Sequence, residues 1–158
     1  MAKTQKAVFA AGCFWGVQAA FDETPGVVKT TVGYCGGKTA NPSYEQVCSH
    51  ASGHAEAVEV EYEPQKISYE KLMLRFFELH DPTQVNRQGP DVGSNYRSAI
   101  FYSSEKEKKE AAALISKLNA SKKYSKPIAT SLEPASTFWV AEDYHQKYYK
   151  THDIACHI

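Results

Sequence analysis

The sequence predicts one mixed α+β domain in which two helices cover one face of an antiparallel sheet. A chain of 158 residues suits a single hydrophobic core, and its 42% hydrophobic and 23% charged residues are typical of a globular domain. Apolar residues recur with a strand period in some segments and with a helix period in others. The first six such segments run strand, helix, strand, strand, helix, strand, which is the order of the ferredoxin-like α/β plait. We therefore expect residues 1–158 to form a single domain.

The first four elements lie in the N-terminal half. Residues 6–11 are short and apolar, which favours a buried strand, and residues 14–24 carry apolar side chains at helical spacing until a Pro-Gly pair stops the pattern. β-Branched residues predict a strand over 27–34, and a loop rich in Gly, Asn and Pro follows through Ser43. Residues 54–62 alternate between apolar and charged side chains, which indicates a strand with one buried face.

The remaining elements begin with a second helix, from the N-cap candidate Ser68 to His80. The connection that follows, 81–97, is long, since most connections have about four to six residues, and loops of this length commonly carry function. We expect the sixth element to be a strand over 98–102. Beyond the plait we expect a helix over 105–120, a strand over 128–132 and a helix over 141–150.

Charge and cysteine content exclude several classes of protein. Eighteen basic residues balance eighteen acidic ones, so the net charge offers no attraction for nucleic acid or for an anionic membrane. The four cysteines are too few for a disulfide scaffold and form no C-x-x-C pair. The apolar run 7–21 is interrupted by Gly and Gln and is too short to span a bilayer. We expect a cytoplasmic protein with reduced thiols.

Cys13 is the first candidate for chemistry because it stands between the first predicted strand and the first predicted helix. A helix N-terminus favours a thiolate through its free N–H groups and its dipole. The alternative is a small buried hydrophobic residue, which is how most cysteines behave. Position alone leaves both interpretations open.

Three further side chains could complete a site around this cysteine. Phe14 and Trp15 are consecutive, so one of them could face a pocket; the alternative is that both pack on the sheet. Glu56 falls in phase with the apolar residues of its strand, so burial would raise the pKa of its carboxyl and make it a proton donor. Its alternatives are an exposed strand end or an ion pair.

Acidic and phenolic side chains in two loops could join the same site. Asp91, Tyr96 and Arg97 are interleaved with Gly and Pro in the long connection, and Tyr44 occupies a similar setting in the earlier loop. The alternative for each of them is a turn cap or a surface residue.

A metal site is the rival arrangement. Its ligands would come from Cys48, His50 and His54, with His152, Cys156 and His157 added from the tail. Their spacing matches no established zinc pattern, so we expect no bound metal.

Seven short segments form a recognisable series along the chain. They are 12–16 (GCFWG), 33–37 (GYCGG), 53–58 (GHAEAV), 80–84 (HDPTQ), 87–93 (RQGPDVG), 96–98 (YRS) and 141–146 (AEDYHQ). In this order they resemble the A-type peptide methionine sulfoxide reductases over nearly the whole chain. The resemblance implies an α/β plait and a repair enzyme that reduces the S epimer of methionine sulfoxide, free or in oxidised proteins, without a metal or bound cofactor.

The resemblance also implies a role for each candidate. Cys13 would attack the sulfoxide sulfur as a thiolate and become a sulfenic acid as methionine leaves. Phe14 and Trp15 would enclose the ε-methyl group, and Glu56 would protonate the sulfoxide oxygen. The residues implied to assist are Tyr44 and Tyr96, at the oxygen, and Asp91, behind the site or at the substrate backbone.

Recycling of Cys13 is implied to use a second cysteine and thioredoxin, with dithiothreitol as the reductant in vitro. Relatives commonly place the resolving cysteine in a Gly-rich C-terminal tail; here the tail, about 150–158, contains Cys156 but no glycine. Cys156 is favoured over Cys35, which stands where Ala is more usual, and Cys48 is expected to be a bystander.

Two other classes of function remain open from the residues alone. A Cys-nucleophile hydrolase or acyltransferase would need a histidine paired with Cys13. A non-enzymatic thiol or metal-binding module is the other alternative.

Overall fold

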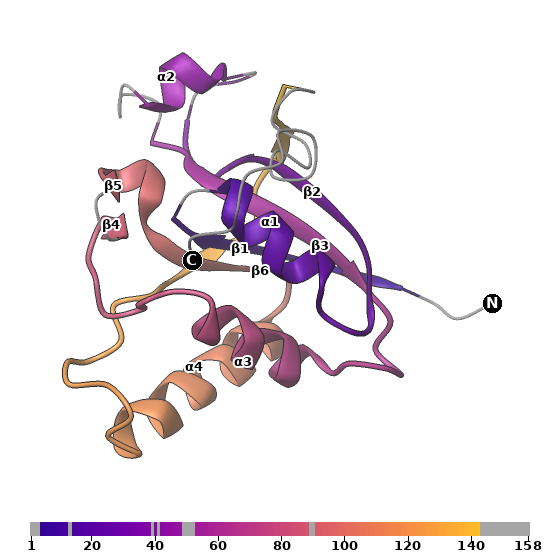
Figure 1. Ribbon diagram of the computed structural model, residues 1–158, viewed down its shortest axis with the longest axis vertical. Coiled ribbons are helices and arrows are strands. Elements are labelled where there is room, and N and C mark those ends of the chain that lie inside the picture. Colours follow the sequence, from indigo (N-terminus) through magenta and orange to yellow (C-terminus); the bar gives the residue numbers. More distant parts are fainter. Residues whose placement is uncertain are drawn as a thin grey trace.

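The computed structural model describes residues 4–12, 14–38, 40, 42–48, 53–88 and 91–142. Within these ranges it contains a six-stranded sheet, a two-stranded sheet and four α-helices (Figure 1). The strands are β1 (Gln5–Ala11), β2 (Val27–Cys35), β3 (Ala55–Tyr62), β4 (Arg87–Gln88), β5 (Asp91–Val92), β6 (Ser98–Tyr102), β7 (Ser131–Pro134) and β8 (Trp139–Val140). The helices are α1 (Phe14–Asp22), α2 (Tyr44–Cys48), α3 (Tyr69–Glu78) and α4 (Glu105–Ala120), with the 3-10 turn η1 (Ser94–Tyr96) before β6.

The large sheet is mixed, with the strand order β7-β6-β1-β3-β2-β8. Its four central strands are the four expected from the sequence, and each neighbouring pair among them is antiparallel. The strand β7 adds to one edge parallel to β6, and β8 adds to the other edge antiparallel to β2. Two strands from the C-terminal part of the described chain therefore flank the antiparallel centre at its opposite edges.

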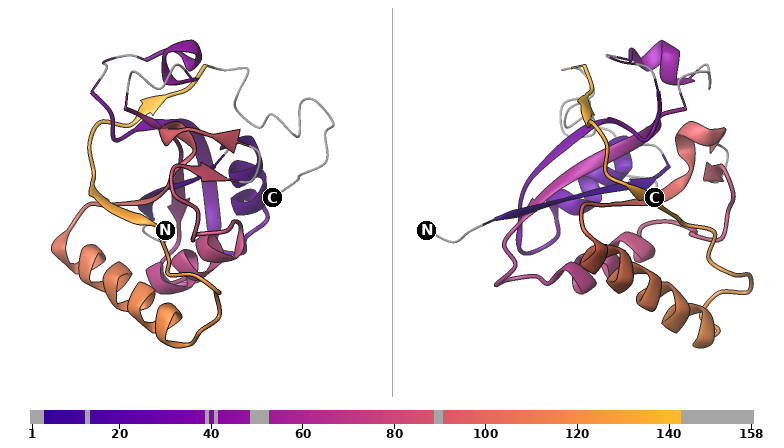
Figure 2. Two further views of the ribbon diagram at one scale, coloured as in Figure 1. Left: turned by 90° about the vertical axis from the view of Figure 1, so that its left-hand side faces the viewer. Right: turned by 180° about the vertical axis from the view of Figure 1, so that it is seen from behind.

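The two faces of the sheet carry side chains of different size. On one face Phe9 stacks on Phe21 of α1 and on Phe76 of α3, with ring centroids 5.5 and 5.0 Å apart. The other face carries mainly small residues, among them Ala10 and Ala57, and is covered in part by Phe138. Helices α3 and α4 lie side by side at one end of the molecule, and α2 lies at the opposite end (Figures 1 and 2). The main core is therefore the face that α1 and α3 cover.

Most predicted elements lie close to their expected bounds, and those at 98–102 and 105–120 match them. Ser68 caps α3 as expected, because its hydroxyl accepts a hydrogen bond of 3.2 Å from the Lys71 amide. The strand expected over 128–132 instead begins three residues later, as β7.

The loop expected through Ser43 does end there, but Tyr44, which was expected in this loop, begins the short helix α2. Ser43 and Gln46 form a capping box: the Gln46 amide donates to the Ser43 hydroxyl at 3.2 Å, and the Ser43 amide donates to Gln46 Oε1 at 2.8 Å. The Ser-x-x-Gln pattern was therefore a readable helix signal.

The C-terminal helix expected over 141–150 is wrong where the structure can test it. Ala141 and Glu142 are not helical, and the Ala141 amide donates to the Val32 carbonyl at 3.0 Å, continuing the edge of the sheet beyond β8. The rest of this segment and the tail about 150–158 lie outside the described residues.

Candidate active site

Cys13 lies outside the described residues, and its neighbours in sequence define the surroundings that can be described. Gly12 is buried and has a φ of +94°, a conformation that favours glycine. A Cβ atom at Gly12 would stand 2.8 Å from the Cβ of Gln88, so only a glycine lets β4 approach so closely. Phe14 is the first residue of α1. The long connection 81–97 therefore packs directly against the turn that precedes this helix.

Glu56 lies on β3 and is buried next to Phe14, the first residue of α1. Its side chain projects from β3 to the face that α1 covers, as the alternation predicted, and the residue is 1% exposed. Glu56 Oε1 accepts a hydrogen bond of 3.3 Å from the backbone amide of Phe14. Its other oxygen, Oε2, accepts one of 3.4 Å from the side-chain amide of Asn95. A carboxyl group thus contacts the backbone amide of the residue that follows Cys13.

Aromatic rings from two helices gather beside this carboxyl. Phe14 is fully buried and Trp15 is half-buried, and their ring centroids are 6.5 Å apart. Tyr44 of α2 stacks on both of them, with centroid distances of 6.3 Å to Phe14 and 6.4 Å to Trp15. Tyr34, opposite Glu56 in the β2–β3 register, adds a fourth ring 5.7 Å from Phe14. The structure brings the predicted Phe14 and Tyr44 together across 30 positions of sequence, whereas Tyr34 was not predicted for the site.

Glu142 forms hydrogen bonds with two residues of this aromatic cluster, and the sequence did not predict it for the site. Its Oε1 accepts a hydrogen bond of 2.9 Å from the Tyr34 hydroxyl, and its Oε2 accepts one of 3.2 Å from the Tyr44 backbone amide. One carboxylate from the C-terminal segment therefore joins the end of β2 to the start of α2. The segment AEDYHQ pointed to this region, but no local pattern indicated the partner.

Tyr96 and Asp91 both lie in the long connection. Tyr96 is half-buried at the end of η1, directly after Asn95, and its backbone amide donates to the Gly93 carbonyl at 3.0 Å. Asp91 pairs with Gln88 in the two-stranded sheet, and its side chain is not among those described. Tyr96 therefore lies in the same turn, η1, as Asn95, whose side-chain amide donates to Glu56.

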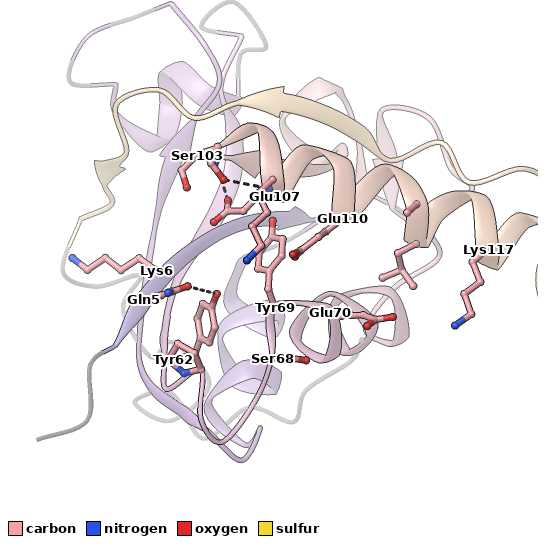
Figure 3. Close-up of a pocket in the computed structure, with 15 residues that line it drawn as sticks. Gln5, Lys6, Tyr62, Ser68, Tyr69, Glu70, Ser103, Glu107, Glu110 and Lys117 are labelled. Carbon is pink, nitrogen blue, oxygen red and sulfur yellow. Dashed lines mark hydrogen bonds between the residues drawn. The ribbon is translucent and has the colours of Figure 1, made fainter.

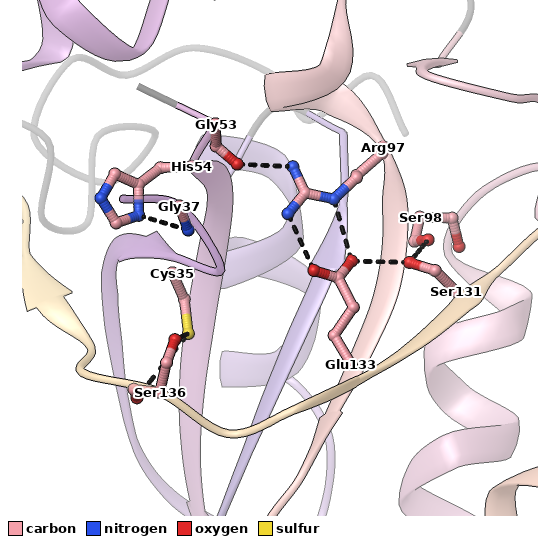
Figure 4. Close-up of polar contacts among 9 residues, drawn as sticks. All are labelled: Cys35, Gly37, Gly53, His54, Arg97, Ser98, Ser131, Glu133 and Ser136. Carbon is pink, nitrogen blue, oxygen red and sulfur yellow. Dashed lines mark hydrogen bonds and ion pairs between the residues drawn. The ribbon is translucent and has the colours of Figure 1, made fainter. Parts of the chain in front are cut away.

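Cys35 lies on the other face of the sheet. It is a free, buried thiol among small residues such as Ala10 and Ala55, and its Sγ lies 3.6 Å from the hydroxyl oxygen of Ser136 (Figure 4). Burial raises the pKa of this thiol, and hydrogen bonds to Ser136 oppose the effect only in part. Cys35 is thus separated by the sheet from Glu56. Cys48 ends α2 with its side chain undescribed, and Cys156 lies outside the described residues.

No group of three or more His, Cys, Asp or Glu side chains that could hold a metal ion occurs among the described residues. His54, one of the ligand candidates, is buried and accepts a hydrogen bond of 3.0 Å at Nδ1 from the Gly37 amide. In the same ranges no helix has the length and apolar character to cross a membrane.

A separate cleft of about 910 Å³ lies between α3, α4 and the edge of β1 and β3 (Figure 3). Tyr62, Tyr69 and Glu107 line it, and none of the predicted site residues does. Burial, and to a smaller extent the nearby carboxylates of Glu107 and Glu110, raise the pKa of Tyr62 to about 12. This cleft is therefore separate from the cluster around Glu56.

Comparison with known proteins shows the family of this chain. The family model described as "Peptide methionine sulfoxide reductase" matches residues 5–158. The peptide methionine sulfoxide reductase MsrA of Acidobacterium capsulatum is 52% identical over 154 residues, covering 97% of this chain and 99% of the relative. The chain therefore belongs to the peptide methionine sulfoxide reductase family and is an oxidoreductase of that class.

Solved structures show the same fold. Mxr1 from Saccharomyces cerevisiae in its reduced form is 35% identical, with a TM-score of 0.91 over 98% of this chain and 90% of that one. Mxr1 in complex with Trx2 is 28% identical, with a TM-score of 0.66 over 92% of this chain and 85% of that one.

Proposed function

We propose that the chain reduces methionine-S-sulfoxide, free or within proteins, with Cys13 as nucleophile and Glu56 as general acid. The observation that carries this proposal is the buried Glu56 carboxyl 3.3 Å from the Phe14 amide, at the first turn of the helix that follows Cys13. An acid held beside the expected nucleophile can neutralise the leaving oxygen as charge develops on it. The family assignment fixes the substrate class to which this arrangement applies.

The first half-reaction moves two electrons from Cys13 to the sulfoxide sulfur. The Cys13 thiolate attacks that sulfur while Glu56 gives its proton to the oxygen. With a second proton from solvent the oxygen leaves as water, the S–O bond breaks, and the two sulfurs stay bonded. Water then attacks Cys13 Sγ, the sulfur–sulfur bond breaks, methionine leaves, a proton returns to solvent, and Cys13 is left as a sulfenic acid. The phenol of Tyr44, stacked on Phe14, and that of Tyr96, next to Asn95, assist at the oxygen. The glutamate carboxylate is reprotonated from solvent.

The aromatic cluster supplies selectivity for a methyl group. Phe14, Trp15 and Tyr44 present three ring surfaces within 6.5 Å of one another, and Trp15 and Tyr44 are half-buried. An apolar cage next to a proton donor distinguishes the two ends of a methyl sulfoxide, because only one orientation places the oxygen at Glu56. The preference for the S epimer is proposed from the family resemblance. Asp91 is proposed to contact the substrate backbone.

The second half-reaction restores the thiol. The Cys156 thiolate attacks the sulfenic acid, water leaves, and the resulting Cys13–Cys156 disulfide is reduced by the dithiol of thioredoxin. Mxr1, a relative of known structure, forms a complex with Trx2, which supports thioredoxin as the partner. Cys35 is the less suitable resolving residue, because its thiol is buried on the opposite face of the sheet.

We also propose the type of fold and the cellular compartment of this enzyme. The order β6-β1-β3-β2 of the central strands supports a ferredoxin-like plait extended at its C-terminus, within one catalytic domain over 1–158. The free thiol of Cys35 and the sparse cysteines fit a cytoplasmic enzyme that needs no bound cofactor.

A test compares reduction of a dabsylated methionine-S-sulfoxide, with dithiothreitol as reductant, in three variants. Cys13→Ser should abolish turnover, and Glu56→Gln should slow it by about two orders of magnitude, since glutamine cannot give up a proton. The matched control is Glu59→Gln, which alters a carboxyl on the same strand but on the opposite face, ion-paired with Lys6 at 3.7 Å. Equal rates for Glu56→Gln and Glu59→Gln would remove Glu56 from the role of acid.

The same experiment addresses the alternative of a Cys-nucleophile hydrolase or acyltransferase. That class needs a histidine to activate Cys13. Cleavage of an ester or amide substrate without loss of the sulfoxide oxygen would favour it over the reductase.

A further inference from the structure

We propose that Asn95 is a positioning residue for the catalytic acid: its side-chain amide holds Glu56 Oε2 so that Oε1 stays at the first turn of α1. The inference rests on the proposed role of Glu56 and extends it to the turn η1. No local sequence pattern marks Asn95 for this role, since it lies 39 positions from Glu56.

Two observations place Asn95 in this role. The residue is 0% exposed, and its Nδ2 donates to Glu56 Oε2 at 3.4 Å. Its Oδ1 is also buried and has no hydrogen-bond partner among the described residues. An unsatisfied buried oxygen destabilises a fold, so an apolar side chain of the same shape would serve packing better. The position is therefore not explained by stability, whereas the hydrogen bond to Glu56 explains it.

The two oxygens of the Glu56 carboxyl accept hydrogen bonds from two different donors. The Phe14 amide holds Oε1, and the Asn95 amide holds Oε2. Once the proton has left, both donors point at a carboxylate, and donation to a charged group is stronger than donation to a neutral one. Asn95 thereby stabilises the ionised form of Glu56 and fixes the plane of the carboxyl.

Other titratable groups lie on the elements packed around Glu56. They are Tyr34 on β2, Tyr44 on α2, His54 at the start of β3, Tyr96 on η1, Glu142, which accepts from Tyr34, and Cys13, next to Phe14 in sequence. Each of them is unchanged in variants at position 95. A change in the titration of Glu56 in such variants is therefore assigned to Asn95.

The test is the titration of Glu56 in the reduced enzyme, followed by carbon-13 NMR of labelled glutamate carboxyl groups. The Glu56 resonance is identified by its loss in Glu56→Gln. Asn95→Leu has a similar shape but no polar atom, so the Glu56 pKa should rise by about one pH unit. Asn95→Asp adds a like charge and should raise it further. The control Gln18→Leu removes another buried amide, which donates to the Thr30 carbonyl at 3.3 Å, and should leave the titration unchanged.

Two readouts separate positioning from a merely structural role. At acidic pH, where Glu56 is protonated, Asn95→Leu should unfold at the same or a higher temperature than the parent, and it should lose stability only as Glu56 ionises. The alkaline limb of its single-turnover rate should move with the Glu56 pKa. An unchanged Glu56 titration in both Asn95→Leu and Asn95→Asp would overturn the proposal, as would a fall in stability and rate together without a shift. The NMR titration needs no turnover, so it remains decisive even if the chain failed to reduce sulfoxides.

Discussion

The Tyr34 hydroxyl donates a hydrogen bond of 2.9 Å to Glu142 Oε1, across 108 positions of sequence. The second oxygen of Glu142 accepts from the Tyr44 amide at 3.2 Å, so this carboxylate holds α2 against the end of β2. Tyr44 can stack on Phe14 and Trp15 only while α2 keeps that position. The proposed substrate cage therefore depends on a residue from the C-terminal segment.

Replacement of Glu142 should weaken substrate binding. We expect Glu142→Ala to raise the KM for methionine-S-sulfoxide by about tenfold, because two hydrogen bonds to a charged group are lost and the Tyr44 ring is released. Steady-state kinetics over a range of substrate concentrations measure this effect. The control Tyr34→Phe removes only the hydroxyl and should show a smaller increase; an unchanged KM in Glu142→Ala would show that α2 does not need this anchor.

The resolving cysteine should be Cys156. Cys156→Ser should release one equivalent of methionine and then stop when thioredoxin is the reductant, because the sulfenic acid has no partner thiol. Cys35→Ala is the matched variant and should continue to cycle, since Cys35 is buried behind the sheet and alanine fits its small neighbours. Rapid-quench and multiple-turnover assays with thioredoxin distinguish the two. Arrest of Cys35→Ala with continued cycling of Cys156→Ser would reverse the assignment.

Elements with a clear period were predictable, and contacts between distant segments were not. The burial of Glu56 follows from its phase in β3, and Ser68 was visible as a cap before α3. The helix α2 was missed although its Ser43–Gln46 capping box is local, because the surrounding Gly, Asn and Pro favoured a loop. Glu142 and Asn95 were not identifiable as partners of the site, since tertiary packing alone brings them to Tyr34 and Glu56. The expected helix over 141–150 was wrong at its start, because Ala141 pairs with the sheet edge.

His80 should make the fold sensitive to acid. Burial lowers the pKa of the His80 imidazole to about 4, although the Phe76 carbonyl and Asp81 oppose this effect. The ring is neutral: its Nδ1 donates to the Phe76 carbonyl at 2.8 Å, and its Nε2 accepts from the Ser98 hydroxyl at 2.8 Å. Protonation of Nε2 would turn this nitrogen into a donor that faces the hydrogen of the Ser98 hydroxyl.

The lowered pKa of His80 determines how the free energy of unfolding changes with pH. Between the ordinary histidine pKa near 6.5 and about 4, the unfolded chain binds a proton at His80 that the folded chain does not, so stability falls as pH falls. From pH 7 to pH 5 the free energy of unfolding should decrease by about 2 kcal/mol through this group. Urea titrations at both pH values, in the parent and in His80→Gln, measure it. An equal decrease in His80→Gln would assign the acid sensitivity elsewhere.

The ion pair between Arg97 and Glu133 should stabilise the start of β3. Arg97 Nε and a second guanidinium nitrogen donate to the two Glu133 oxygens at 2.9 and 3.0 Å, and the remaining nitrogen donates to the Gly53 carbonyl at 3.2 Å (Figure 4). Burial raises the pKa of Glu133, but hydrogen bonds from Arg97 and Ser131 and the Arg97 charge outweigh it and leave the pKa lowered. This pair joins β6, β7 and the segment before β3.

Removal of one partner should cost more than removal of both. Arg97→Met leaves Glu133 without its countercharge and should lower the free energy of unfolding by about 3 kcal/mol. The double variant Arg97→Met/Glu133→Leu should recover part of that loss. Denaturant unfolding of the single and double variants forms the cycle. Additive losses would show that the two side chains do not stabilise the fold as a pair.

The most direct measurement is single-turnover reduction of each epimer of dabsylated methionine sulfoxide by the reduced enzyme, without added reductant. The S epimer should yield one methionine for each Cys13, together with oxidation of that cysteine, and the R epimer should yield none. Equal yields from both epimers, or methionine released without oxidation of Cys13, would contradict the proposed reaction.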